Sequence, residues 1–334
     1  MNAMLRRILT VLVLLFAGTL FVGCSGGGNH TPEFVFRYAE NQSRYYPTTM
    51  GAFYFADLVY IRTGGNVQIH VFYDADLGSE NSVISQLQIG GIDFARLSIT
   101  SFGDALPMFN VLQLPYIFRD EHHMWTVLDG PIGEEFIAAT GELGMTGLSW
   151  FDAGARSFYT RSEIRVPGDI AGLRVRVQPS ALKMEMIESF GARPVPMAFS
   201  EVFSALERWE VEAAENNWPS FESALHYQVA PFFLLSEHVR VPELQVISNH
   251  ALERLPEEYV GIIRQAALES AIFQRREWGL RERDAEERMR ESGIKVIYLS
   301  PEERRLFEEL ALPLREVFAY GYMEYVNRII STGL

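Results

Sequence analysis

Cysteine is nearly absent from this chain of 334 residues, in which Cys24 is the only one. An intramolecular disulfide and a cysteine-based metal site are therefore excluded. The net charge of −14 is unfavourable for the basic patches that bind nucleic acid, so we expect no nucleic-acid partner. Since 48% of the residues are hydrophobic, the chain has enough apolar side chains to build cores of ordinary size without cross-links.

Catalytic and cofactor motifs are missing as well. The sequence contains no G-x-S-x-G, no H-E-x-x-H, no phosphate-binding loop and no glycine-rich dinucleotide motif. Carboxylates are plentiful, but no pair of them stands out as a general acid and base. His122 and His123 are adjacent, so they point in different directions on a helix and lack the i, i+4 spacing of a metal site. We therefore predict a protein that is not an enzyme and that uses no metal and no cofactor.

The first 24 residues have the pattern of a bacterial lipoprotein signal peptide. Arg6 and Arg7 precede an apolar run over 8–23, which is shorter than the roughly 20 residues of a membrane-spanning helix. The segment Phe21-Val22-Gly23-Cys24 resembles a lipobox, whose thiol receives the lipid. Residues 25–31 contain three glycines and are a predicted flexible tether. These features predict a periplasmic, lipid-anchored protein, with an uncleaved anchor as the alternative.

Two sets of strands and helices follow along the chain, and they alternate in the manner of parallel α/β sheets. The first set is predicted to have strands and helices at 33–41, 45–62, 67–72, 80–89, 92–99 and 147–151. The second set is predicted at 172–177, 180–190, 191–197, 200–206 and 210–214. A strand at 244–248 is expected to return to the first set. Ligands of such sheets bind at the carboxyl ends of the strands.

Residues 256–291 are predicted to form one long helix, because they have no internal proline and carry apolar residues at helical spacing. A helix of this length measures roughly 50 Å, which exceeds one small domain and is enough to span two. Its later half, 275–290, is a charge run typical of a solvated face. The segment 301–334 is expected to be helical too.

Residues 169–222 carry the best candidates for binding an organic anion. In the strand 172–177, alternation places Arg174 and Arg176 on the face opposite the apolar side chains. A guanidinium presents a planar set of donors that matches a carboxylate. The segment 215–221 adds amides and the aromatic Trp218. The alternatives are an ion pair within the protein for Arg176 and a core position for Trp218.

Several segments of the chain resemble the motifs of one family, in the same order. Residues 172–177 are similar to a "GlKiRv" motif, 191–206 to "lGa.pvpm...Evy.aL" and 211–216 to "vDGqEN". Shorter matches lie at 77–80, 91–93, 114–116 and 169–172. The family is that of the solute-binding receptors of tripartite ATP-independent periplasmic (TRAP) transporters, of the DctP type, and the resemblance covers nearly the whole mature chain.

This resemblance implies an α/β, two-lobe, periplasmic-binding-protein-like fold with a hinge and a long helix spanning both lobes. Combined with the predicted elements, it assigns 32–153 and 242–283 to the first lobe. The second lobe then takes 154–241 and 284–334.

The resemblance also implies the site. Arg176 corresponds to the carboxylate-binding arginine, Arg156 to a second arginine, and Asn216 to an asparagine after the "vDGqE" turn. The full set of expected ligand-binding residues is Arg176, Arg156, Asn216, Asn41, Trp218 and Glu80. Glu212 and Ala213 depart from the usual Asp-Gly, so the turn before Glu215 is expected to differ in shape.

The function implied is that of a receptor that captures a small organic acid and delivers it to the small and large membrane subunits of a TRAP transporter. The sequence Asn216-Asn217-Trp218, next to the arginines, favours a sugar acid such as a hexuronate. The alternative is a lipoprotein with a vestigial or apolar-ligand cleft that works with a helical-repeat partner protein.

Overall fold

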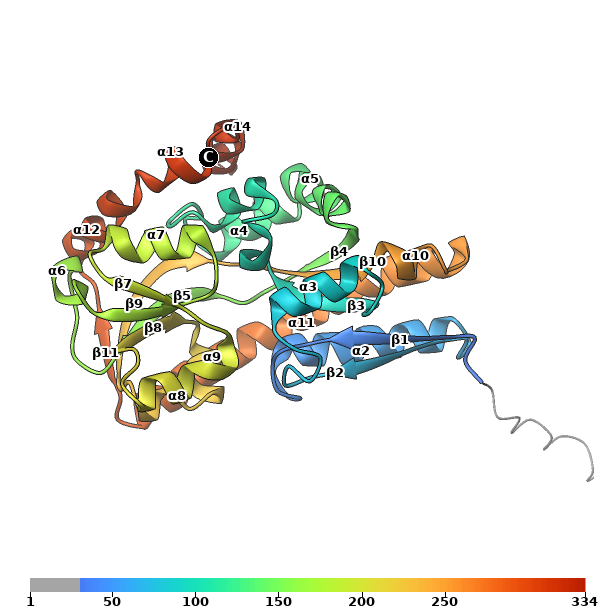
Figure 1. Cartoon of the computed structure of the whole chain (residues 1–334), viewed down its shortest axis with the longest axis horizontal. Helices are drawn as coiled ribbons and strands as arrows, with labels where there is room; N and C mark the ends of the chain where they lie inside the picture. The colour runs from blue at the N-terminus through green and yellow to red at the C-terminus, as the bar shows by residue number, and fades with distance from the viewer. Residues whose placement is uncertain (1–30, 334) are drawn as a thin grey trace, which may run out of the picture.

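The computed structural model describes residues 31–333, which form two β-sheets with helices packed around them (Figure 1). The first sheet has the order β2-β1-β3-β10-β4, and the second has the order β11-β9-β5-β8-β6-β7. Each sheet is the centre of one lobe, which confirms the predicted two-lobe α/β class. The predicted signal peptide, Cys24 and residues 25–30 of the tether lie outside the described residues.

The strands match the predicted ones closely, with three additions that the sequence analysis missed, namely β5, β9 and β11. The first sheet contains β1 (Phe34–Ala39), β2 (Val67–Phe72), β3 (Phe94–Ser98), β4 (Met145–Phe151) and β10 (Glu243–Ser248). The second contains β5 (Ala155–Thr160), β6 (Arg174–Val177), β7 (Arg193–Pro196), β8 (Ala213–Asn216), β9 (Phe232–Arg240) and β11 (Lys295–Tyr298).

The predicted helices are present, but the last segment is divided into three, and α5, α9 and α10 were not predicted. Those of the first 140 residues are α2 (Pro47–Arg62), α3 (Glu80–Gln88), α4 (Glu121–Leu128) and α5 (Pro131–Ala139). The next are α6 (Pro167–Ile170), α7 (Ala181–Ser189), α8 (Val202–Glu207), α9 (Trp218–Ser223) and α10 (Asn249–Leu252). The chain ends with α11 (Glu257–Glu291), α12 (Pro301–Ala311), α13 (Leu314–Phe318) and α14 (Met323–Ser331).

The strand directions bring polar loop residues from both lobes together. In the first sheet, β1 is parallel to β2 and β3, while β10 runs antiparallel to β3 and β4. In the second, β6 is parallel to β7 and β8. Side chains at the carboxyl ends of parallel strands share one edge of a sheet. Asn41, just after β1, and Asn216, the last residue of β8, are therefore placed at such edges.

The lobes are connected by two strand crossings and by α11. The crossings are β4 to β5, through Gly154, and β9 to β10. Gly154 has a φ of +63°, and a Cβ there would collide with the Glu282 carboxyl and the Trp278 indole. A side chain is thus excluded at this crossing by conformation and by space.

Helix α11 packs on both lobes (Figure 1). Its first half contributes Ile263 and Ala266 to the core around α2 and the first sheet. Its second half contributes Ala285 and Met289 to a core of the second lobe. This confirms the predicted long helix spanning both lobes. Among residues 31–333, no helix has the length and apolar character that a membrane crossing requires.

The last helix, α14, packs against α4 and α5, as Figure 1 shows beside the C-terminus. Arg328 pairs with Glu135 at 2.6 Å, and the His123 ring lies 2.8 Å from the Ile329 carbonyl oxygen. The sequence division had placed 284–334 wholly in the second lobe. The structure instead attaches α14 to elements that the division assigned to the first.

Candidate ligand-binding site

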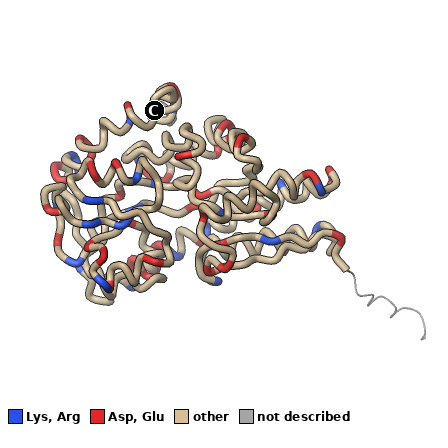
Figure 2. Tube along the Cα trace, in the orientation of Figure 1, with Lys and Arg blue, Asp and Glu red and all other residues tan. Residues whose placement is uncertain are grey.

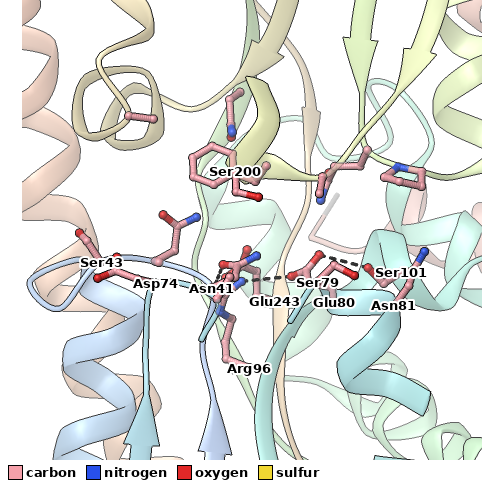
Figure 3. A pocket seen from close by; sticks show the side chains of 18 of the residues that line it. Asn41, Ser43, Asp74, Ser79, Glu80, Asn81, Arg96, Ser101, Ser200 and Glu243 are labelled. Atoms are coloured by element: carbon pink, nitrogen blue, oxygen red, sulfur yellow. Dashed lines mark hydrogen bonds and ion pairs between the residues drawn. The ribbon is translucent and has the colours of Figure 1, made fainter. Parts of the chain in front are cut away.

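A cavity of about 330 Å³ lies between the two lobes and is lined by residues of both (Figure 3). This volume is in the range of sites that hold small organic molecules. The first lobe supplies polar and charged side chains that include Asn41, Asp74, Glu80, Arg96, Ser101 and Glu243. The second lobe supplies Arg156, Arg176, Gln178, Phe199, Ser200 and Asn216. Five of the six predicted site residues therefore line one cavity.

Arg176 is a buried cation that lines the cavity. The residue is 1% exposed, and its Nε and Nη2 donate to the Met197 carbonyl oxygen at 3.2 and 2.9 Å. Its Nη1 finds no hydrogen-bond partner within residues 31–333, and no carboxylate of that part lies within ion-pair distance. Burial lowers the pKa of this guanidinium from its usual value. A buried charge without a counterion is unfavourable, so the site is prepared for an anion.

Arg156 is held by its own lobe. Its Nη2 donates to a Glu215 carboxylate oxygen at 2.8 Å, and its Nε also pairs with that carboxylate. Its Nη1 donates to Asn216 Oδ1 at 2.9 Å. Burial would raise the Glu215 pKa, but the Arg156 charge and the His238 ring, whose Nε2 lies 3.7 Å from the carboxylate, hold it well below its usual range. Glu215 thus stays ionised and fixes the orientation of the Arg156 guanidinium.

Asn216 presents its amide as a donor. Its Oδ1 accepts from Arg156 and from the Asn217 backbone N–H at 2.9 Å. The amide oxygen is therefore used within the protein, and the NH2 group is the part left to face the cavity that Asn216 lines.

The two arginines of β6 have different partners, although both alternate away from the apolar face. Arg174 is clamped by Glu212, which accepts from the Arg174 backbone N–H at 2.8 Å and from its Nε at 3.1 Å. Glu212 is the residue that departs from the family motif. Its longer side chain holds Arg174 outside the cavity, whereas Arg176 lines it.

The first-lobe wall is built around a buried arginine that the sequence analysis missed. Arg96 is 2% exposed and donates its Nε to Glu40 at 3.0 Å. Its Nη1 lies 3.4 Å from Glu80 and 3.1 Å from Glu243, and its Nη2 also donates to Asn41. Arg96 therefore positions three of the cavity-lining side chains: Asn41, Glu80 and Glu243.

The carboxylates of this wall titrate unusually. Burial, assisted by the charge of Glu243, raises the pKa of Glu80 to about 7, against hydrogen bonds from the Ser98 N–H and the Ser101 hydroxyl. Burial also raises the pKa of Glu243, although Arg96 and Arg156 act in the opposite direction. The wall thus resists carrying both negative charges.

The prediction that Trp218 binds the ligand is wrong, because this residue does not line the cavity. Its ring stacks on Phe233 with centroids 3.6 Å apart, and only 5% of the residue is exposed. It belongs to the core of the second lobe with Phe221. The aromatic side chain that does line the cavity is Phe199, the first residue of a short 3-10 helix (Phe199–Glu201) before α8. Its place could have been found from the matched segment 191–206, in which it is the only aromatic residue besides Phe203.

The electrostatic field in the cavity is set by the charged residues that line it rather than by the net charge of the protein. Figure 2 shows that positions of basic and acidic residues are both distributed along the Cα trace of each lobe. Within the cavity, Arg156 and Arg176 stand on one side and the carboxylates of Glu80 and Glu243 on the other. No group of three or more His, Cys, Asp or Glu residues within 31–333 is arranged to hold a metal ion.

Comparison with known proteins gives consistent matches. The DctP model, described as bacterial extracellular solute-binding protein, family 7, matches residues 38–320. A solute-binding protein of Chromohalobacter salexigens is 35% identical over 280 residues, which are 84% of this chain and 83% of that protein. Two solved structures superpose with a TM-score of 0.86, and each match covers 89% of this chain and 99% of the other. They are TRAP periplasmic solute-binding proteins from Bradyrhizobium sp. BTAi1 in complex with α/β-D-galacturonate, 37% identical, and from Roseobacter denitrificans with bound β-D-glucuronate, 35% identical.

Proposed function

Because this chain belongs to bacterial extracellular solute-binding protein family 7, we propose that it is the receptor of a TRAP transporter for a hexuronate or a similar sugar acid. It captures the ligand between its lobes, leaves it chemically unchanged and delivers it to the membrane subunits. The observation that carries the ligand class is Arg176, a buried cation of the cavity with no carboxylate partner in residues 31–333.

The carboxylate of the ligand is placed at Arg176. A bond between a guanidinium and a carboxylate is charge-assisted and contributes about 1.5–3 kcal/mol, more than a neutral hydrogen bond. Arg156 lies on the same wall, but Glu215 already neutralises it. Arg176 is therefore the anchor, and Arg156 with Asn216 supplies neighbouring donors.

The rest of the cavity suits a hydroxylated ligand. Asn41 and Asn216 present amides, Glu80 and Glu243 present acceptors, and Phe199 offers an apolar ring. A sugar acid has hydroxyl groups that both donate and accept, and it has an apolar ring face. The similar proteins with bound galacturonate and glucuronate support the same ligand class.

Calorimetric titration with D-galacturonate, D-glucuronate and D-glucuronamide tests this function. The amide keeps the sugar but removes the negative charge, so Arg176 remains buried without a counterion. We expect the uronates to bind and the amide to bind at least about 30-fold more weakly. Equal affinity for acid and amide, or no binding of either acid, contradicts the proposal.

The same proposal places the protein at the membrane through a lipid on Cys24. Its support is the lipobox-like segment Phe21-Val22-Gly23-Cys24 after a short apolar run. Labelled fatty acid should enter the wild type and not the Cys24→Ser variant. Equal labelling of both contradicts the lipid anchor and leaves the ligand-binding proposal untouched.

The alternative of a vestigial cleft is not supported by the site. In a cleft that had lost its ligand, or that took an apolar one, a buried Arg176 without a carboxylate partner among residues 31–333 would only destabilise the protein. The helical-repeat partner stays a prediction from the sequence.

A further inference from the structure

The wall of the cavity that faces Arg176 carries an excess of negative charge. Glu40, Glu80 and Glu243 surround the single guanidinium of Arg96. Three carboxylates and one guanidinium leave two negative charges in excess when all are ionised. The side chains of Glu80 and Glu243 are 15% and 13% exposed, and both line the cavity. Figure 3 shows them next to Asn41, Ser79 and Ser101, and Ser200 on the opposite side.

The opposite wall has the reverse sign. Arg156 and Arg176 carry two positive charges, and Glu215 neutralises the first of them. The cavity therefore has a cationic end at Arg176, in the second lobe, and an anionic end at Glu80 and Glu243, in the first. A ligand that fills it must present opposite chemistry at its two ends.

We propose that Glu80 and Glu243 select the charge of the ligand, by accepting hydrogen bonds from the hydroxyls of a monoanionic sugar acid and by excluding a second carboxylate. This inference rests on the proposed function, since it assumes that the ligand carboxylate is at Arg176. It makes Glu243 a specificity-determining residue, and it makes Arg96 the positioning residue that holds both carboxylates.

The physical reason is the pairing of donors with acceptors. An ionised carboxylate only accepts hydrogen bonds, so it pairs with a hydroxyl and repels another carboxylate. In a partly buried site this repulsion is screened far less than in water. The raised pKa of Glu80, to about 7, shows that the wall already resists a second charge of its own. The second carboxylate of a dianionic ligand would add a third negative charge next to this wall.

The test compares D-galacturonate with galactarate, which carries a carboxylate at both ends of the same carbon chain. Both are titrated at about pH 8, where Glu80 is mostly ionised. The variants are Glu80→Gln and Glu243→Gln, which keep the shape and remove the charge. Asp76→Asn is the matched control, because Asp76 is an acidic residue of the loop after β2 that is exposed to solvent and lies outside both the cavity lining and the Arg96 cluster.

We expect wild type to bind galactarate at least about 100-fold more weakly than galacturonate. Each Glu→Gln variant should gain about tenfold or more in galactarate affinity and gain nothing for galacturonate, while Asp76→Asn changes neither by more than about threefold. A wild type that binds both acids equally, or Glu variants that leave galactarate affinity unchanged, overturns the inference although galacturonate binds. A wild type that binds neither acid overturns the proposed function, and the inference with it.

Discussion

Replacing Arg176 with methionine should move stability and affinity in opposite directions. The guanidinium is 1% exposed, two of its nitrogens share one carbonyl oxygen, and Nη1 has no partner within residues 31–333. Removal of a buried charge without a counterion relieves a desolvation penalty, which is several kcal/mol for a fully buried ion and smaller for one that lines a cavity, as Arg176 does. The Met197 carbonyl loses its donors, at a cost of about 1 kcal/mol. The net expectation for the ligand-free protein is a gain of about 1 kcal/mol.

The loss of affinity is larger than the gain in stability. Truncation of one partner of a buried charged pair costs about 2–5 kcal/mol, which is roughly 30-fold to several thousand-fold in Kd. Arg176→Lys keeps the charge but not the planar geometry, so its affinity should lie between those of the wild type and Arg176→Met.

Thermal unfolding of the ligand-free variants and calorimetric titration with D-galacturonate measure the two effects. The expected gain corresponds to a rise in Tm of about 2 °C for a chain of this size. The control is Arg174→Met, because Arg174 lies on the same strand but is paired with Glu212 outside the cavity. It should leave affinity within about twofold. An Arg176→Met variant that is less stable than wild type and still binds the uronate would show that Arg176 is a structural arginine.

Four further outcomes are expected. Gly154→Ala should lower stability by about 1–2 kcal/mol in thermal unfolding, because φ is +63° and the Cβ meets Glu282 and Trp278. Trp218→Ala should lower stability by about 3–5 kcal/mol, and its calorimetric affinity should stay within about threefold. The pKa of Glu80 is raised, so its contribution to the stability of the folded protein is full below the usual carboxyl pKa and is lost as pH rises to about 7. Glu80→Gln should remove this loss of stability, which is measured by unfolding the protein at pH values between those two. Saturating uronate should lower the radius of gyration in solution scattering, and an unchanged profile would contradict lobe closure.

The elements with strong periodicity could be predicted from the sequence, and an interrupted strand could not. Helix α11 and strand β2 have the bounds expected, to within one residue. Strand β9 was missed because Ser-Glu-His interrupts its apolar run. In the structure, Glu237 has a φ of +42°, and the register of β9 with β5 shifts between Arg156 and Phe158. The segment 301–334 was expected to be helical throughout, and the structure divides it near Pro313 and Gly321, where φ is +83°.

The site was predictable where local pattern and family motif agreed. Arg176 met both conditions, and it lines the cavity. Arg96 met neither, because β3 is wholly buried and the carboxylate that pairs with it, Glu40, lies 56 residues away. Trp218 was misplaced for a related reason. Its stacking partner, Phe233, lies in β9, so the core that buries the indole was not visible in the sequence.

Binding of an anion by a chain of net charge −14 requires that the attraction be short-ranged. At physiological salt, exposed charges are largely screened beyond about 8 Å, whereas buried ones are screened much less. Arg176, which has no carboxylate partner within residues 31–333, belongs to the second lobe, and the acceptors Glu80 and Glu243 belong to the first. A carboxylate alone therefore has binding partners in only one lobe. A sugar acid has partners in both, because its charge pairs with Arg176 and its hydroxyls pair with the opposite wall. The same two-ended chemistry that selects the ligand thus provides the free energy that draws the lobes together.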